Sequence, residues 1–316
     1  MKAVKFFLDL FFIARPVVLV PVWGFALFGY RISSQTQNIF QTINIEILLQ
    51  ILLFSLSVAA VYVINQIADR KVDEDNGGFP LLLKCGICDK TAWILAIILA
   101  VLSIVIPFLS GYKIISALSL VSILVGLLYC FPPFSFSGRP ILDFLSNAFG
   151  YGTIAFAAGW ILGDGEKTNT EFFLAMLPYF LMMAGGSISS TLPDYYGDKA
   201  NGKITTAVCF GKRQSHFIAI LCIILSVAGA FYVRDFVALS ASSFAFVIYV
   251  LYAIFPKNQK LMESCYKVGG AVSMLIIGMF FPILIISGII IGILSILYFR
   301  IFYKVSYPSL LPVEKK

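Results

Sequence analysis

Two groups of polar residues have the types and the spacing needed to hold a divalent cation. Asn65, Asp69 and Asp73 follow one another at intervals of four residues near the end of a long apolar run. On a helix, residues at this spacing stack along one face, one turn above another. Asp194 and Asp198 repeat the spacing at the end of another apolar run. Carboxylates beside apolar runs of this length are costly to desolvate, so they indicate a functional site.

The chemistry that suits these residues is the binding of Mg²⁺ together with a phosphorylated ligand. Mg²⁺ prefers hard oxygen ligands, usually one or two carboxylates completed by water and substrate phosphates. Two carboxylate pairs that face each other across a cavity can hold more than one ion, with a diphosphate between them. Asn65 can add an amide oxygen or a hydrogen bond to phosphate, and Arg70, Lys199 and Lys203 can add positive charge. Either pair alone would also fit a solvated helix end, but two matching pairs argue against that alternative.

The composition places these residues in an integral membrane protein. The chain has 316 residues, of which 60% are hydrophobic and 12% are charged, and its mean hydropathy is +0.94. Soluble domains are less apolar and about twice as charged. Runs of Leu, Ile and Phe without strict alternation favour helices over a β-barrel. The net charge of +7 therefore indicates basic cytoplasmic loops, and we expect no nucleic-acid partner and no obligate protein partner.

The apolar runs predict an all-α bundle of nine or ten transmembrane helices in a single polytopic domain, residues 1–316. Residues 1–15 are predicted to form an interfacial segment, and residues 304–316 a polar tail. A window of about 20 residues per span gives these segments: 16–30, 45–65, 91–109, 114–131, 141–162, 172–190, 214–233, 236–255, and 268–303, which is long enough for two.

Charge predicts the orientation in a cell membrane. If the N-terminus is cytoplasmic, the loops on that side carry most of the basic residues, as cytoplasmic loops generally do. These residues are Lys2, Lys5, Arg70, Lys71, Lys84, Lys90, Arg139, Lys199, Lys203, Lys212, Arg213, Lys257, Lys260 and Lys267. The opposite loops hold Arg31, Lys113, Lys167 and Arg234. Both acidic groups then lie on the cytoplasmic side.

The motifs resemble those of a known family. Asn65-x-x-x-Asp69-x-x-x-Asp73 and Asp194-x-x-x-Asp198 are similar to the two aspartate-rich motifs of the UbiA-type intramembrane prenyltransferases. The surroundings agree, because the chain also contains Arg15-Pro16, Tyr129-Cys-Phe-Pro132-Pro133 and Gly197-Asp198-x-x-x-Gly202-x-x-Thr205. The chain departs from the family pattern in two places. In the family, one basic residue often follows the first aspartate-rich motif, and another often follows the Tyr-x-x-Pro-Pro stretch. Here Lys84 comes late after the first motif, and Phe134 and Ser135 precede Arg139.

The resemblance implies a helical bundle with a central cavity that opens sideways to lipid and is capped by the two motif loops. It also implies Mg²⁺-dependent transfer of an isoprenyl group from its diphosphate to a lipophilic or aromatic acceptor, with release of diphosphate. A quinone precursor is the favoured acceptor, and a glycerol-phosphate ether lipid or a chlorophyll-type acceptor is the alternative. The expected catalytic metal ligands are Asp69, Asp73, Asp194 and Asp198. The expected substrate-binding residues are Arg15, Asn65, Arg70, Tyr129, Arg139, Lys199 and Lys203.

A function of another class remains as an alternative, namely a cation-coupled membrane transporter. Carboxylates within a membrane fit this function too. Transporter sites, however, lie near the bilayer midplane on broken helices, whereas both acidic groups here end apolar runs beside basic residues that repel cations. Asp143 and Asn147 lie one turn apart in the segment 141–162. They can serve as polar contacts between helices or as part of an acceptor pocket.

Overall fold

The computed structural model describes residues 2–75, 79–164 and 170–307, and all regular structure in these ranges is helical. This confirms the predicted all-α architecture. The helices are α1 (Lys2–Ile13), α2 (Pro16–Ser33), α3 (Ile45–Asp75), α4 (Leu81–Cys85), α5 (Asp89–Leu109), α6 (Lys113–Cys130), η1 (Phe136–Gly138), α7 (Leu142–Asn147), η2 (Ala148–Ala155), α8 (Phe156–Leu162), α9 (Thr170–Thr191), α10 (Tyr195–Ala200), α11 (Thr206–Phe210), α12 (Lys212–Tyr232), α13 (Phe236–Ile254), α14 (Gln259–Phe280) and α15 (Pro282–Tyr303).

In the described part of the chain, nine helical stretches are long and apolar enough to cross a membrane, and the first of them includes α1 and α2. The predicted segment 268–303 is two helices, because α14 ends at Phe280 and α15 begins at Pro282. The predicted segment 141–162 is helical as well, but the π-helical turn η2 interrupts it between α7 and α8. The protein is therefore a multi-pass membrane protein. The predicted polar tail lies mostly outside the described residues.

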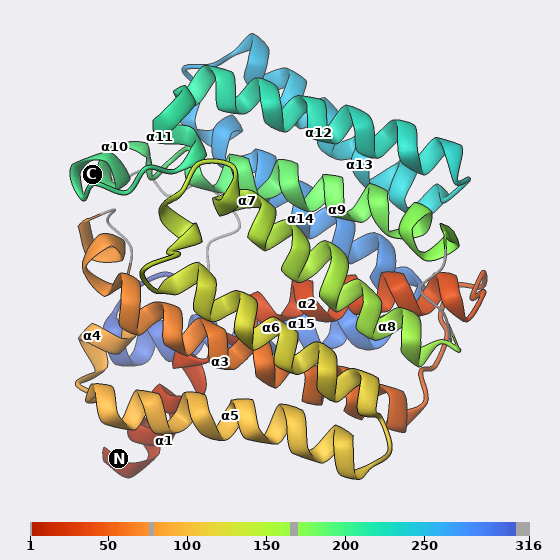
Figure 1. The fold of residues 1–316 in the computed structure, drawn as a ribbon. Coiled ribbons are helices and arrows are strands. Elements are labelled where there is room, and N and C mark those ends of the chain that lie inside the picture. Colours follow the sequence, from red (N-terminus) through yellow and green to blue (C-terminus); the bar gives the residue numbers. More distant parts are fainter. Residues whose placement is uncertain (1, 76–78, 165–169, 308–316) are drawn as a thin grey trace.

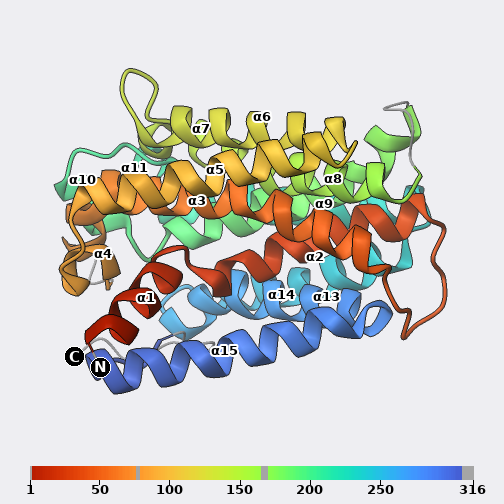
Figure 2. The ribbon, with the colours of Figure 1, turned by 90° about the horizontal axis from the view of Figure 1, so that it is seen from below.

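The long helices lie roughly side by side, and the short helices α4, α10 and α11 gather at one end of the bundle (Figure 1). We call this the motif end. A view turned by 90° shows the same end and places α6 and α15 on opposite outer sides, with α2 between them (Figure 2). Helix α1 lies at the motif end in both views and contacts α3 and α4. Large apolar side chains such as Ile97 on α5 and Ile290 on α15 are exposed, as expected on surfaces that face lipid.

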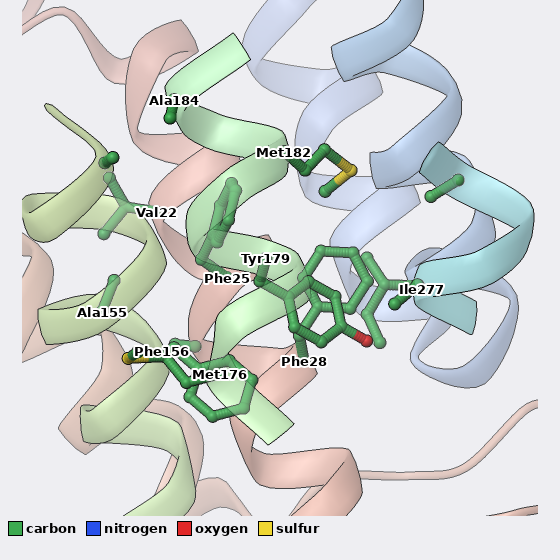
Figure 3. Packing of buried hydrophobic residues seen from close by; sticks show 14 of the residues in the cluster. Val22, Phe25, Phe28, Ala155, Phe156, Met176, Tyr179, Met182, Ala184 and Ile277 are labelled. Atoms are coloured by element: carbon green, nitrogen blue, oxygen red, sulfur yellow. The ribbon is translucent and has the colours of Figure 1, made fainter. Parts of the chain in front are cut away.

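The core is built from aromatic side chains of several helices. Phe28 on α2, Phe156 on α8 and Tyr179 on α9 are fully buried. The ring of Tyr179 lies 4.4 Å from that of Phe28 and 5.4 Å from that of Phe156, measured between centroids (Figure 3). A Cβ atom on Gly159 of α8 would lie 1.6 Å from the carbonyl oxygen of Ala26. Glycine therefore allows the backbones of α2 and α8 to pack directly against each other.

Candidate functional site

The first motif lies on the last turns of α3, which continues past its apolar part to Asp75. The side-chain amide of Asn65 donates a hydrogen bond to Oδ2 of Asp69 at 3.0 Å. This contact shows that the four-residue spacing places the two side chains on one helix face, as predicted. Asn65 also lines the central cavity. The first motif therefore begins inside the cavity and continues toward the motif end of the bundle.

Arg15 reaches the same motif from the joint between α1 and α2. Its backbone adopts the left-handed conformation with φ 52°, directly before Pro16 begins α2. A non-glycine residue in this region carries a strain of about 1–3 kcal/mol, which surrounding contacts must offset. The guanidinium of Arg15 donates to Oδ2 of Asp73 at 3.3 Å and also lines the cavity. The strained joint thus directs a cation to the first motif.

The second motif lies beyond the predicted segment 172–190, on a short helix of its own. Helix α9 ends at Thr191, because the residue before Pro193 is disfavoured in helical conformation. Asp194 then precedes α10, and the buried Asp198 lies within it. The amide N–H of Asp198 donates to the carbonyl oxygen of Asp194 at 2.9 Å, so one helical turn connects the two residues.

Lys203 joins the two motifs. Its backbone N–H donates to the carbonyl oxygen of Asp198 at 2.9 Å, which fixes it to the second motif. Its side-chain Nζ donates to Oδ2 of Asp69 on the first motif at 3.1 Å. The side chains of Lys203 and Asp69 are only 18% and 17% exposed. Lys203 therefore links two acidic motifs separated by more than a hundred residues, through its ammonium group to the first and through its backbone to the second.

Burial and charge shift the ionisation of these groups. Burial raises the pKa of the Asp73 carboxyl, and the neighbouring Asp69 raises it further, although Arg15 opposes the shift. Burial alone would lower the pKa of Lys203, but the nearby Asp69 more than offsets this, so the pKa lies above its ordinary value. Lys203 is therefore a permanent cation at the motif end.

The segment that follows Lys203 is anchored to α7. Asp143 is 2% exposed, and its carboxylate accepts hydrogen bonds from the backbone N–H of Thr206 at 2.7 Å and from the Thr206 hydroxyl. The Thr206 hydroxyl in turn accepts from the N–H of Ile141. Asp143 thus holds the loop between α10 and α11. Of the two roles that the sequence left open, the polar contact between elements is the one that the structure shows for Asp143.

A cavity of about 500 Å³ lies beside the motifs, between α2, α3, α6, α7, η2, α9, α12, α13 and α14. Its walls are mostly apolar, and Arg15 is the one charged side chain among the described residues that line them. Asn147 is also in the wall, where its amide donates to Oγ of Ser187 at 2.9 Å and to the Tyr129 hydroxyl at 3.5 Å. Tyr129 is thus in the cavity, as expected.

Some cavity residues were not identified from the sequence. Tyr62 and Tyr151 line the cavity, and their hydroxyls contact each other. Tyr62 lies three residues before Asn65, so its position on the motif face of α3 was available from helical spacing. Ser187 comes from α9 and lies seven residues before Asp194 in the sequence, with the α9–α10 break between them. No local pattern identified it.

Three of the residues expected to bind phosphate, namely Arg70, Arg139 and Lys199, are not among the residues that line the cavity. Consecutive residues on a helix point about 100° apart, so Arg70 does not share the face of Asp69 and instead forms an ion pair with Asp89 at 2.6 Å. Arg139 is exposed and donates to the carbonyl oxygen of Pro133. Neither of them lines the cavity. Lys199 is exposed on α10, and a role for it stays a prediction.

The donor set is suited to Mg²⁺, although it is not a closed metal centre. Within the described ranges, no three His, Cys, Asp or Glu side chains converge as a ready set of ligands. The four motif aspartates nevertheless supply the hard oxygen atoms that Mg²⁺ prefers, and an ion held by one or two carboxylates completes its shell with water and phosphate. Asp73 and Asp69 already hold Arg15 and Lys203. The cluster of four motif aspartates therefore requires positive charge, and the side chains of Arg15 and Lys203 provide part of it.

The fold and the site together define a helical membrane protein with a charged cluster at one end of an apolar cavity. Residues 18–268 match the UbiA prenyltransferase family, and the chain belongs to this family. The match covers both motifs and most of the bundle, and it confirms the resemblance seen in the sequence. Family membership also argues against the transporter alternative.

Known relatives agree with this assignment. A segment of 169 residues is 25% identical to the probable homogentisate phytyltransferase 2, chloroplastic, of Oryza sativa subsp. japonica, and it covers 49% of this chain and 42% of the rice protein. A solved UbiA homologue from Archaeoglobus fulgidus, bound to GPP and Mg²⁺, has a TM-score of 0.64 at 22% identity, with 85% of this chain and 98% of that chain covered. A structure reported for digeranylgeranylglyceryl phosphate synthase has a TM-score of 0.56 at 20% identity, with 92% and 98% covered. At these identities the solved structures establish the fold.

Proposed function

We propose that the protein is a Mg²⁺-dependent prenyltransferase that moves an isoprenyl group from its diphosphate to a lipophilic or aromatic acceptor and releases diphosphate. The observation that carries the proposal is the position of Lys203, which binds Asp69 while its backbone is fixed to Asp198. Two acidic motifs and a cation thus meet beside an apolar cavity. Membership of the UbiA prenyltransferase family and the GPP and Mg²⁺ bound by the Archaeoglobus homologue support this function.

The proposed roles follow from the contacts at the site. Asp69, Asp73, Asp194 and Asp198 would hold the metal ions, which would supply positive charge to the departing diphosphate. Asn65 orients Asp69 through the hydrogen bond between their side chains. Arg15 and Lys203 exchange their carboxylate partners for diphosphate oxygens, and the exposed Lys199 adds charge at the edge of the site.

The cavity contributes by excluding water. An allylic diphosphate that loses its leaving group becomes a carbocation, and water would capture this cation before the acceptor does. The apolar walls formed by residues such as Val22, Phe25 and Met274 line the space that the isoprenyl chain would occupy. Tyrosine rings in the same wall can stabilise positive charge through their faces. Tyr62 and Tyr151 are the aromatic residues suited to this role.

The proposed location is a cell membrane, with the motif end on the cytoplasmic side. The excess of basic residues in the loops at this end supports this orientation. The proposed partners are an isoprenyl diphosphate, an acceptor and membrane lipid. The similarity to the rice protein, whose name refers to homogentisate, supports an aromatic acceptor of the quinone-precursor type.

The test is an assay of the purified protein in detergent with Mg²⁺, geranylgeranyl diphosphate and a panel of aromatic and glycerol-phosphate acceptors. We expect Mg²⁺-dependent release of diphosphate and a prenylated product. Replacing any one of the four motif aspartates by alanine should abolish turnover while circular dichroism and gel filtration stay unchanged. Full activity in such a variant, or no Mg²⁺-dependent binding of the diphosphate to the native protein, would contradict the proposal.

A further inference from the structure

The charge of the cavity wall restricts the acceptor. Among the described residues that line the cavity, Arg15 is the one charged side chain. A carboxylate or phosphate on the acceptor would have to leave water on entering this space, and an anion that is buried without a partner is strongly disfavoured. A cavity for an anionic acceptor would therefore be expected to have a further cation in its wall.

Arg15 in the cavity wall and Lys203 at the motifs are already assigned to the diphosphate in the function proposed above, on which this inference rests. Lys267, which follows the lining residue Tyr266, is paired with Glu263. Arg15 is bound to Asp73, and Lys203 is bound to Asp69. Arg139, the basic residue that follows the Tyr129 motif, is exposed and held by the carbonyl oxygen of Pro133. The oxygens of a bound diphosphate thus engage Arg15 and Lys203, and the acceptor meets the neutral groups of the wall.

Those neutral groups form a defined polar site in the wall. The amide of Asn147 contacts the hydroxyls of Ser187 and Tyr129, and the three residues come from α7, α9 and α6. All three line the same cavity. An amide and two hydroxyls offer both donors and acceptors of hydrogen bonds without net charge. Such a group matches a phenolic hydroxyl, which also donates and accepts.

We propose that the acceptor is an uncharged hydroquinone, an aromatic ring with phenolic hydroxyls and without carboxylate or phosphate, and that Asn147, Ser187 and Tyr129 bind one of its hydroxyls. In the reaction, the bond between C1 of the isoprenyl group and the diphosphate oxygen breaks, and its electron pair leaves with the diphosphate. A π electron pair of the ring forms the new carbon–carbon bond. The ring carbon then loses its proton to the released diphosphate, which restores the aromatic ring.

The experiment compares matched acceptors that differ by a carboxylate. The pairs are methylhydroquinone against homogentisate, and dihydroxynaphthalene against dihydroxynaphthoate. Binding of each to the purified protein, loaded with Mg²⁺ and a non-hydrolysable isoprenyl diphosphate analogue, is measured by calorimetry, and turnover is measured with geranylgeranyl diphosphate. We expect the uncharged member of each pair to bind at least about tenfold more tightly.

Variants separate the polar site from the rest of the cavity. Asn147→Ala and Ser187→Ala should each raise the KM of the uncharged acceptor about two- to tenfold, which corresponds to the loss of one hydrogen bond, and leave the KM of the diphosphate unchanged. Ser273→Ala is the control, because the Ser273 hydroxyl also lines the cavity but contacts the Gly269 carbonyl oxygen and Sδ of Met182 rather than the polar site. Ser187→Ala keeps the test valid if Asn147→Ala fails to fold.

Each remaining outcome contradicts the proposal. Equal or tighter binding of the carboxylated acceptors would show that the cavity accommodates an anion. An equal effect of Ser273→Ala would show that the polar site has no special role. The absence of binding by both members of each pair, while the diphosphate analogue still binds with Mg²⁺, would exclude hydroquinones and leave the prenyltransferase function standing. Loss of diphosphate binding itself would instead contradict the proposed function.

Discussion

Removal of the Lys203 ammonium should change metal binding and diphosphate binding in opposite directions. In Lys203→Met the side chain is unbranched and only one atom shorter, but it no longer neutralises Asp69, to which Nζ of Lys203 donates at 3.1 Å. Without diphosphate, Mg²⁺ should therefore bind the variant more tightly than the native protein, since no lysine has to be displaced. With Mg²⁺ present, the diphosphate should bind more weakly, since one of its cations is missing.

The magnitude follows from the burial of the ion pair. Exposed ion pairs contribute about 0.2–1 kcal/mol, and breaking a fully buried pair costs about 3–5 kcal/mol. Lys203 and Asp69 lie between these limits, because their side chains are 18% and 17% exposed. An effect of about 1–2 kcal/mol corresponds to a factor of roughly 5–30 in each binding constant.

Isothermal titration calorimetry measures both constants on protein in detergent. Lys203→Arg is the first control and should stay close to the native values, because it retains the charge. Lys84→Met is the second control, since Lys84 pairs with Glu74 in a more exposed position on the same side of the bundle. An unchanged or weaker affinity for Mg²⁺ in Lys203→Met, or an unchanged affinity for the diphosphate, would refute the reasoning.

Two further predictions concern the supports of the site. Asp9→Asn should lower the free energy of unfolding by about 1–3 kcal/mol, because the 3% exposed Asp9 carboxylate accepts hydrogen bonds from Tyr298, Tyr303 and Lys5. Thermal unfolding in detergent measures this change, and an unchanged melting temperature would contradict it. Gly159→Ala should destabilise by about 1–3 kcal/mol or more, because its new methyl group would overlap the α2 backbone. Gly292→Ala, with open space around it, should have a negligible effect, and equal melting temperatures of the two glycine variants would contradict the packing argument.

The spans and the first motif could be predicted from local sequence. The four-residue interval from Asn65 to Asp73 is a property of one continuous helix, and the hydrogen bond between Asn65 and Asp69 shows the predicted shared face. The spacing of residues along a helix does not show which acidic residue a basic side chain will pair with. Arg70 is next to Asp69 in the sequence, but its direction on the helix takes its side chain to Asp89, and a role for it at the phosphate stays a prediction.

The contacts between segments that are distant in the chain could not be predicted from the sequence. The anchoring of Thr206 by Asp143 joins residues 63 positions apart, and no periodic pattern marks it. Pro193 separates α9 from α10 in the structure, and the position of Asp198 depends on how α10 packs against α3 and α11. The polar site of Asn147, Ser187 and Tyr129 likewise depends on the packing of three helices. Local patterns therefore supplied the candidate residues, and tertiary packing decided which of them meet.

The contact between α1 and α15 has a consequence for the order in which the protein is completed. Lys5 donates to the Tyr303 hydroxyl at 2.8 Å across a separation of 298 residues. Helix α1 leads into Arg15, and both α1 and α15 extend beyond the family match at residues 18–268. During synthesis on the ribosome, the hydrogen bonds between α1 and α15 are therefore absent until α15 has been made, although α3 and α4 can already contact α1. A nascent chain that already contains both acidic motifs therefore still lacks one of the supports of the helix that leads to Arg15.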